Sequence, residues 1–266
     1  MEALNKSDIP RIWQPTPAGK LFTSAIDWVF TLEGEGFSLQ AGDIKREGSV
    51  ISLESLEVRP GLFWATIKMP LVELPSLLLD GIPNVAAKEM AQAVAGAIKA
   101  LRHRQRVAEQ LKEFGQSVQL VSRWAGKTRA ACKVQLKIKG WLTHEFKRDI
   151  NLSKPQGLDV LLAVPEVTAY LEKQPQALKA DVDLWRHDFE DLADGINENH
   201  LTKELQESRS FFEQVEKSPL TDEQARAVVS FDNRVLLVAS AGSGKTSTMV
   251  AKAGYALSKG YFAADQ

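Results

Sequence analysis

A glycine-rich loop followed by lysine and threonine carries the clearest chemistry in this sequence of 266 residues. The loop ASAGSGKT consists of Ala239, Ser240, Ala241, Gly242, Ser243, Gly244, Lys245 and Thr246. Small residues let the backbone curl around a phosphate, so that successive N–H groups point inward. Lys245 would supply positive charge to the β- and γ-phosphates, the Thr246 hydroxyl would bind Mg²⁺, and Ser247 would add a contact. The pattern predicts a nucleotide-binding site.

The elements on either side of the loop must hold it in place. RVLLVA, residues 234–239, is a short and nearly continuous apolar run of the kind found in fully buried strands. KTSTMVAKAGYALSK, residues 245–259, is typical of a helix, and Gly260 suits its C-terminal end. The N-terminus of that helix would add the positive end of its dipole to the site. Strand, loop and helix in this order are the context that a phosphate-binding loop requires, although Ala239 stands where glycine is usual.

Gln224 has two interpretations. Thr221 and Gln224 match a capping box, in which the two side chains satisfy backbone amides at a helix start. A side-chain amide can also donate and accept in one bidentate contact, which suits the edge of adenine. On spacing alone, both interpretations stay open.

Two segments together resemble the opening of UvrD/Rep-like superfamily 1 DNA helicases. LTDEQARAVV, residues 220–229, precedes the AGSGKT loop, as a Q motif precedes the loop A-x-A-G-S-G-K-T in that family. Alanine at the first loop position is common there, so Ala239 fits the family pattern. Further likeness to the N-terminal region of the helicase IV subfamily, where an accessory domain precedes the motor, comes from residues 208–229, GWLTHEFKRDI at 140–150, LFWATIKM at 62–69 and GIPN at 81–84.

The resemblance implies an enzyme that depends on ATP and Mg²⁺. Such helicases move 3′ to 5′ along single-stranded DNA and unwind duplex or forked DNA. This unwinding activity is used in DNA repair. The resemblance implies that Gln224 contacts adenine, that residues 239–247 hold the phosphates, and that Lys245 and Thr246 are the catalytic residues among them.

Other parts of that machinery do not occur in the sequence. No D-E-x-x pair that follows an apolar strand and could act as metal ligand and base, no arginine finger and no second motor domain is found before Gln266. We therefore expect the N-terminal part of a longer helicase, which alone hydrolyses ATP negligibly because nothing further stabilises the transferring charge. The rival hypothesis is a non-enzymatic DNA-binding or interaction module with a vestigial loop. An unrelated P-loop kinase or ATPase is a third.

The fold class follows from pattern and turn residues. We expect an α+β accessory region, a small β unit followed by long helices, that leads into the first βα unit of an α/β RecA-like P-loop domain. Strands are expected over 26–32, 36–40, 50–58 and 62–69. The expected parts are a loosely held, proline-containing leader at 1–20, a β accessory domain at 21–83, a mainly helical region at 84–216 and the truncated start of the P-loop domain at 217–266.

The helical region is expected to begin with a long helix over 84–114. Asn84 would cap it, Gly115 would end it, and Val85, Met90, Val94, Ala97 and Leu101 would form its apolar stripe. Residues 116–148 fit strands or helices. Helical pattern returns from 165 to 216, with breaks expected at Pro175 and at DGIN, 194–197, and a short helix is expected over 218–233.

Charge is divided along the chain although the formal net charge is −1. Residues 101–148 hold 12 basic and 3 acidic side chains, a net of +9, whereas residues 159–216 hold 5 basic and 14 acidic ones, a net of −9. A basic segment with tryptophans can bind a phosphate backbone and stack on bases. The candidate DNA-binding residues are Arg123, Trp124, Lys127, Arg129, Lys133, Lys137 and Lys139. The alternatives are a solvated helix face with buried tryptophans, and a basic segment covered by the acidic one.

Composition excludes several classes of protein. A single cysteine, Cys132, rules out an internal disulfide framework, and the four histidines show no metal-ligand spacing, so Mg²⁺ held through a nucleotide is the expected metal. The N-terminal residues lack the apolar run of a secretory signal, and no run is long enough to span a membrane. We therefore expect a cytoplasmic protein without a membrane partner. Oligomeric state stays open.

Overall fold

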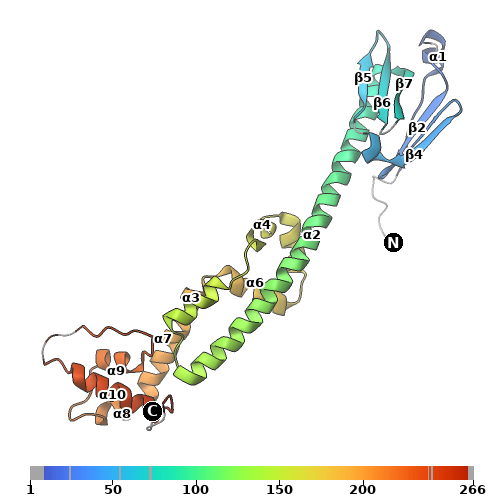
Figure 1. Cartoon of the computed structure of the whole chain (residues 1–266). Helices are drawn as coiled ribbons and strands as arrows, with labels where there is room; N and C mark the ends of the chain where they lie inside the picture. Colours follow the sequence, from blue (N-terminus) through green and yellow to red (C-terminus); the bar gives the residue numbers. More distant parts are fainter. Residues whose placement is uncertain are drawn as a thin grey trace. The chain divides into compact units, whose positions relative to one another are not determined.

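The computed structural model describes residues 9–23, 25–53, 55–71, 74–238, 240 and 242–262. Backbone contacts divide the chain into two compact units, residues 1–109 and 110–266, which are described separately. The long helix α2, Asn84–Lys139, contributes residues to both (Figure 1).

The first unit begins with a four-stranded antiparallel sheet in the order β1-β2-β3-β4. Its elements are β1 Arg11–Trp13, α1 Pro17–Thr23, β2 Trp28–Glu33, β3 Gly36–Ala41 and β4 Ile44–Ser49. The strands expected over 26–32 and 36–40 are confirmed, and they pair from Trp28–Ala41 to Glu33–Gly36. The expectation of a loose leader is wrong for its described part, because Trp13 is buried and Pro17 occupies the first turn of α1, where proline is tolerated.

A second antiparallel sheet has the order β5-β6-β7. It consists of β5 Glu57–Pro60, β6 Trp64–Leu71 and β7 Leu74–Pro83. The strand expected over 50–58 is only partly correct, because a 3-10 turn, η1 Val50–Leu53, comes first and buries Val50 and Leu53 against the core. Both sheets pack on the first turns of α2 through Phe30, Ile67 and Met90, which are fully buried.

Helix α2 begins at Asn84 as expected but continues 25 residues beyond the predicted end at residue 114, since it reaches Lys139. Gly115 lies within the helix without a positive φ. A glycine costs a helix about 1 kcal/mol relative to alanine, whereas burying one large apolar side chain stabilises by about 1.5–3 kcal/mol. Phe114, Val118 and Val121 are all buried around Gly115, so packing outweighs the glycine.

The start of α2 differs in two details from the expectation. Met90, Val94 and Leu101 are buried, but Val85 is 81% exposed and does not belong to the apolar stripe. The Asn84 side chain donates its amide to the Gly61 carbonyl oxygen instead of capping the helix, and its own oxygen is buried without a partner among the described residues.

The second unit is helical beyond α2. Its elements are α3 His144–Leu152, α4 Leu158–Leu162, α5 Pro165–Glu172, α6 Gln176–Arg186, α7 Phe189–Glu207, α8 Arg209–Gln214, α9 Asp222–Val229 and α10 Lys245–Ser258. The break expected at Pro175 is confirmed, since Pro175 precedes α6. The break expected at 194–197 is wrong, because α7 runs through it and buries Ala193 and Asn197.

Helices α8, α9 and α10 gather at the end of α7 (Figure 1). Their common core contains Leu201, Phe212, Val228 and Tyr255. The short helix expected within 218–233 and the helix expected over 245–259 are therefore confirmed as α9 and α10, and Gly260 follows α10 with φ +70°.

The strand expected over 234–239 is wrong for its described part. Residues 234–238 lie in no helix or strand, with Leu236 87% and Val238 83% exposed. A buried strand needs hydrogen-bonded neighbours and covered faces. In the part of the chain that the structure describes, no strand pairs with this segment. No helix there is both long and apolar enough to cross a membrane.

Candidate functional site

The side chain of Gln224 touches both a helix start and the glycine-rich loop. Gln224 Oε1 accepts from the Thr221 amide at 2.9 Å, and Thr221 Oγ1 accepts from the Gln224 amide at 3.3 Å, so the capping box is confirmed. Gln224 Nε2 donates to the Ser243 carbonyl oxygen at 3.0 Å. The Gln224 side-chain amide thus links the start of α9 to the loop. A nucleotide base could bind this amide only by replacing its present partners, Thr221 and Ser243.

The loop itself turns through two glycines with left-handed backbone, Gly242 at φ +80° and Gly244 at φ +83°. A Cβ on Gly244 would lie 2.6 Å from Gln224 Nε2, so any larger residue there would displace the end of the Gln224 side chain. Gly244 is the N-cap of α10 and offers no side chain to its first amides. These amides can therefore donate to an anion, and the helix dipole favours negative charge at the same place.

The predicted phosphate and Mg²⁺ residues lie at this helix start. Lys245 Nζ donates to the Ser240 carbonyl oxygen at 2.5 Å, and Ser243 Oγ donates to the same oxygen at 2.8 Å. Thr246 is exposed and Ser247 is half-buried in the first turn of α10. Ala239 and Ala241 lie outside the described residues. The loop thus brings together Ser240, Ser243 and Lys245 of the predicted set, with Gln224 beside them.

Helix α10 is anchored by a buried carboxylate that the sequence reasoning missed. Glu204 Oε2 on α7 accepts from Tyr255 Oη at 2.6 Å, from Lys259 Nζ at 2.6 Å and from Ser208 Oγ at 3.2 Å. Burial by itself would raise the Glu204 pKa, but these donors outweigh it and lower the pKa below the ordinary value. No short sequence pattern marks Glu204, because its partners come from separate elements.

A half-buried lysine joins α10 to α9. Lys252 Nζ donates to the carbonyl oxygens of Ala227, at 2.8 Å, and Ser230, at the C-terminal end of α9, and lies 4.6 Å from the centre of the Phe231 ring. Burial lowers the Lys252 pKa to about 8. Together with the Gln224–Ser243 bond, this contact holds both ends of α9 against the loop and its helix.

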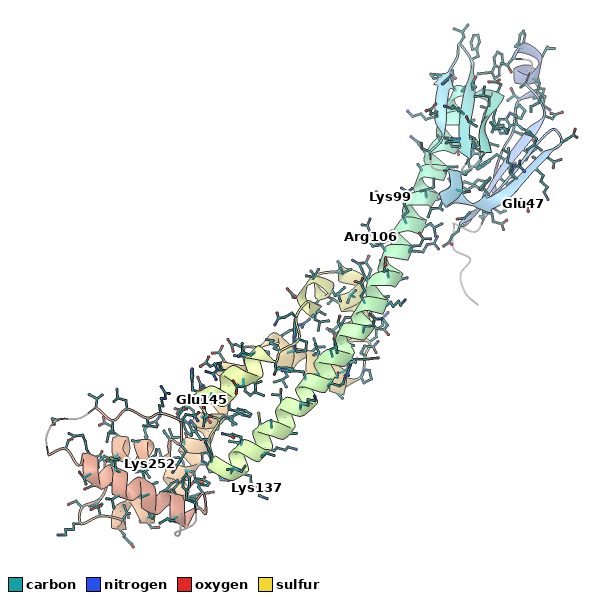
Figure 2. The ribbon with its side chains drawn as sticks, in the orientation of Figure 1. Glu47, Lys99, Arg106, Lys137, Glu145 and Lys252 are labelled. Carbon is teal, nitrogen blue, oxygen red and sulfur yellow. The ribbon has the colours of Figure 1, made fainter. Side chains whose placement is uncertain are left out.

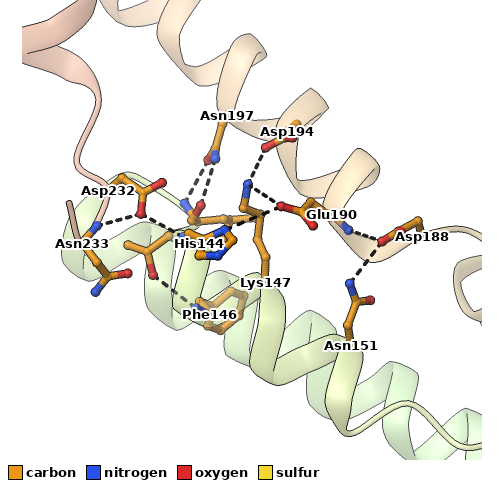
Figure 3. A network of polar contacts seen from close by, with 12 residues as sticks. His144, Phe146, Lys147, Asn151, Asp188, Glu190, Asp194, Asn197, Asp232 and Asn233 are labelled. Atoms are coloured by element: carbon orange, nitrogen blue, oxygen red, sulfur yellow. Dashed lines mark hydrogen bonds and ion pairs between the residues drawn. The ribbon is translucent and has the colours of Figure 1, made fainter. Parts of the chain in front are cut away.

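The segment that leads from α9 toward the loop is bonded to the start of α3 (Figure 3). Asp232 accepts from the backbone amides of His144, at 2.9 Å, and Asn233, at 2.7 Å. Further along α3, Lys147 Nζ bonds Asp194 Oδ1 of α7 at 2.7 Å (Figure 3). Accessory helices therefore contact the segment that carries the loop.

The candidate DNA-binding residues all lie on α2, but they differ in exposure. Trp124 is only 6% exposed, and its indole donates to Ser153 Oγ at 3.2 Å, which corrects the expectation of an exposed ring that stacks on a base. Arg129 bonds Asp181 of α6 at 2.6 Å. The exposed or half-exposed cations are Arg123, Lys127, Lys133, Lys137 and Lys139; Lys137 is labelled in Figure 2.

Acidic helices therefore do pack on part of the basic segment. The Arg129–Asp181 and Lys147–Asp194 pairs join basic residues of α2 and α3 to acidic ones of α6 and α7. This bears out in part the alternative that the acidic segment covers the basic one.

Comparison with known proteins identifies the accessory region. The family model for the N-terminal region of DNA helicase IV and RNA helicase matches residues 12–187, well over half of the chain. The chain belongs to this helicase IV N-terminal family. The model for the UvrD/REP helicase N-terminal domain matches residues 220–266, which contain α9, the loop and α10.

One curated relative is much longer than the stretch that it shares with this chain. DNA helicase IV of Escherichia coli (strain K12) is 37% identical over 128 residues, which make up 47% of this chain and 18% of that protein. The match thus spans less than a fifth of the relative's length. No solved structure matches the chain.

The described residues contain no cluster of three or more histidine, cysteine or acidic side chains that could hold a metal ion.

Proposed function

We propose that this helicase IV N-terminal family chain is the N-terminal part of an ATP-dependent 3′ to 5′ DNA helicase whose nucleotide site is formed by α9, the loop and α10. The observation that carries the proposal is the bond from Gln224 to the Ser243 carbonyl oxygen at 3.0 Å. This bond joins α9, which we propose as the Q motif, to the loop that we propose binds phosphate, and a helicase needs these two segments side by side. The match of residues 220–266 to the UvrD/REP domain supports the same site.

The residues present fit ATP and Mg²⁺. The α10 amides lack a side-chain cap, Gly242 has no atom within 4 Å of the position a Cβ would take, and the Thr246 hydroxyl is exposed at the same helix start. The amides and Lys245 would hold the phosphates, Thr246 would bind Mg²⁺, and Ser247 would contact the phosphate from the next position. When bound, Mg²⁺ neutralises charge on the phosphate oxygens.

Lys245 would exchange one partner for another on nucleotide binding. Its ammonium group now donates to the Ser240 carbonyl oxygen. A phosphate oxygen carries more charge than a carbonyl oxygen and accepts a stronger hydrogen bond from an ammonium group. Gln224 would likewise exchange its loop contact for the edge of adenine. Residues 239–247 would form the phosphate cradle around these two side chains.

The apolar segment 234–238 supports a RecA-like sheet as the eventual setting of the loop. Leu236 and Val238 are exposed here, and both are residues that favour a buried strand. Further strands of the motor would cover them and brace the loop. Asp265 is the only acidic residue after Lys245 in the sequence, so we propose that the 266-residue chain binds ATP but hydrolyses it very slowly.

The exposed cations of α2 are proposed to contact single-stranded or forked DNA. Arg123, Lys127, Lys133 and Lys137 share one side of the helix, whereas Lys139 lies on the opposite side and Arg129 is paired with Asp181. They would contact phosphates, since Trp124 is buried and offers no ring to a base.

The rival function is a DNA-binding or interaction module with a vestigial loop. The unpaired state of residues 234–238 favours it, because a loop without a braced strand holds phosphates less firmly. The two proposals differ in nucleotide affinity and agree in DNA binding.

Titration calorimetry of Mg·ATP into the 266-residue chain, with Lys245→Ala and Gln224→Ala variants, separates them. We expect the parent to bind, Lys245→Ala to lose most of the affinity for ATP and GTP alike, and Gln224→Ala to lose chiefly the preference for ATP over GTP. Absence of ATP binding by the parent, with DNA binding retained, would favour the vestigial loop. DNA-stimulated hydrolysis by the 266-residue chain would refute the proposed slow turnover.

A further inference from the structure

The first unit presents large apolar side chains to solvent at one place. Phe22 on α1 is 71% exposed, Phe63 is 65% exposed and Leu62 is 89% exposed. Both phenylalanine rings contact Trp64, with ring centres 5.5 Å apart for Phe22 and 5.7 Å for Phe63. Exposed aromatic side chains gathered in this way mark binding surfaces more often than chance placement does.

Trp64 holds these rings in fixed positions. Its indole donates to Thr16 Oγ1 at 3.2 Å, and Thr16 Oγ1 accepts from the Gly19 amide at the start of α1. The Thr16 amide donates to the Gly81 carbonyl oxygen, which ties α1 to β7. Phe22 lies nearly parallel to Trp64, at 17° between ring planes. A ring held rigidly loses little conformational entropy when a flat partner stacks on it.

The aromatic patch adjoins the start of α2. The Asn84 amide donates to the Phe63 carbonyl oxygen, and the Asn84 side chain bonds Gly61. Val85, which follows, is 81% exposed. The patch therefore continues onto the face of α2 that begins at Val85.

That face of α2 is basic. Residues separated by three, four or seven positions share one face of a helix, and from Val85 they are Lys88, Glu89, Gln92, Ala95, Lys99, Arg102, His103 and Arg106. All are exposed, and four cations stand against one carboxylate, Glu89, at the edge of the face. Lys99 and Arg106 lie on one side of α2 (Figure 2).

Four of these cations differ from several other basic residues of the unit. Lys20, Lys45, Lys68 and Arg104 each form an ion pair with a carboxylate of the same unit. For Lys88, Lys99, Arg102 and Arg106 the described residues provide no such partner within ion-pair distance. Lys88 and Arg106 are 18 positions apart, which is about 27 Å along a helix. These four side chains therefore form a line of positive charge that no carboxylate of the described residues pairs with.

We infer that this surface binds single-stranded DNA, with bases stacked on Phe22 and Phe63 and phosphates along Lys88, Lys99, Arg102 and Arg106. Rigid aromatic rings beside a basic track are the combination by which proteins hold single strands without sequence preference. Duplex DNA has no open bases for the rings. All residues of the surface belong to the first unit, whereas the nucleotide residues belong to the second. The choice of DNA over RNA rests on the proposed helicase function.

Fluorescence anisotropy with a labelled oligothymidylate tests this in the 266-residue chain without nucleotide. Phe22→Ala combined with Phe63→Ala should weaken binding about tenfold or more, and the two Tyr replacements should restore it. Neutralising Lys88, Lys99, Arg102 and Arg106 to glutamine should reduce the slope of log affinity against log salt by about 2.8, since each single-strand phosphate contact contributes about 0.7.

Matched variants separate this surface from its alternatives. Neutralising Lys45, Arg46, Lys173 and Lys203 removes the same charge elsewhere and should leave the slope nearly unchanged. Leu62→Ala removes a non-aromatic side chain of the patch and should leave DNA affinity unchanged. Equal loss in both charge variants, no effect of the aromatic pair, or tighter binding of RNA than of DNA would overturn the inference. Loss of self-association in the aromatic variant without loss of DNA binding would instead identify a protein interface. Because Lys245→Ala leaves this surface intact, failure here and failure of the nucleotide site are distinguishable.

Discussion

Replacement of Tyr255 by phenylalanine removes one hydrogen bond and keeps the ring. The Tyr255 hydroxyl donates to Glu204 at 2.6 Å, and the residue is fully buried against Phe212 and Phe231. A hydrogen bond to a charged group contributes about 1.5–3 kcal/mol to stability. We therefore expect the free energy of unfolding to fall by about 2 kcal/mol and the midpoint of thermal unfolding by about 4–8 °C.

The pH dependence of this loss follows from Glu204. Burial would raise the pKa of Glu204. The hydrogen bonds donated by Lys259, Tyr255 and Ser208 stabilise the charged carboxylate more strongly than burial destabilises it, so the pKa lies below the ordinary value of 4.5. A group with a lowered pKa stabilises the fold above its unfolded pKa, and that stability is lost as pH falls through the folded pKa. The difference in stability between parent and Tyr255→Phe should therefore be constant near neutral pH and shrink in acid.

Denaturant unfolding followed by circular dichroism, at neutral and acidic pH, measures both effects. Tyr170→Phe is the matched control, because Tyr170 is 44% exposed and its hydroxyl should contribute less than about 0.5 kcal/mol. If Tyr255→Phe were as stable as the control, or if its deficit grew in acid, the proposed anchoring of α10 by Glu204 would be wrong.

Two further predictions concern the polar side chains of Asn197 and Lys252. Asn197→Ala leaves the Leu142 amide and carbonyl groups, each bonded to Asn197 at 2.9 Å, without their partner, and should cost about 2–4 kcal/mol in chemical unfolding, whereas a neutral result would contradict the role of this pair. Lys252, with its pKa lowered to about 8, releases its proton more easily when folded, so its contribution to stability should increase as pH rises from about 8 to 10.5. The stability of the parent relative to Lys252→Met should rise over that interval, and a falling difference would refute the assigned pKa shift.

Local sequence pattern correctly predicted those helices and strands for which the turn or cap residues and the later packing favour the same structure. The pairing of β2 with β3 follows alternating apolar residues around Gly34, and the capping box of Thr221 and Gln224 marks the start of α9. The prediction that the helix ends at Gly115 was wrong because a glycine costs a helix only about 1 kcal/mol. The free energy gained by burying Phe114 and its neighbours is larger.

Other errors arose where distant residues decide the outcome. Trp124 lies in a basic stretch but packs against Leu158 and Val182, which no local pattern shows. Residues 234–238 have the composition of a buried strand, yet the described residues supply no strand to pair with them. Glu204 and Lys252 escaped attention because their partners lie on other helices. The sequence shows which side chains could bind DNA, a base or a charge, whereas contacts between distant helices decide which of them are exposed and which are bonded.

We propose that the loop at Lys245 binds the ATP that drives a helicase of which this chain is the N-terminal part. The most direct measurement is strand displacement by the native polypeptide, purified from its own cells with an antibody against residues 21–150, on duplexes with 3′ or 5′ single-stranded tails. We expect a polypeptide longer than 266 residues that unwinds the 3′-tailed duplex only with ATP, and an inactive counterpart when the cells carry Lys245→Ala. A native polypeptide without ATP-dependent unwinding of either duplex, or with unwinding unaffected by Lys245→Ala, would contradict the claim.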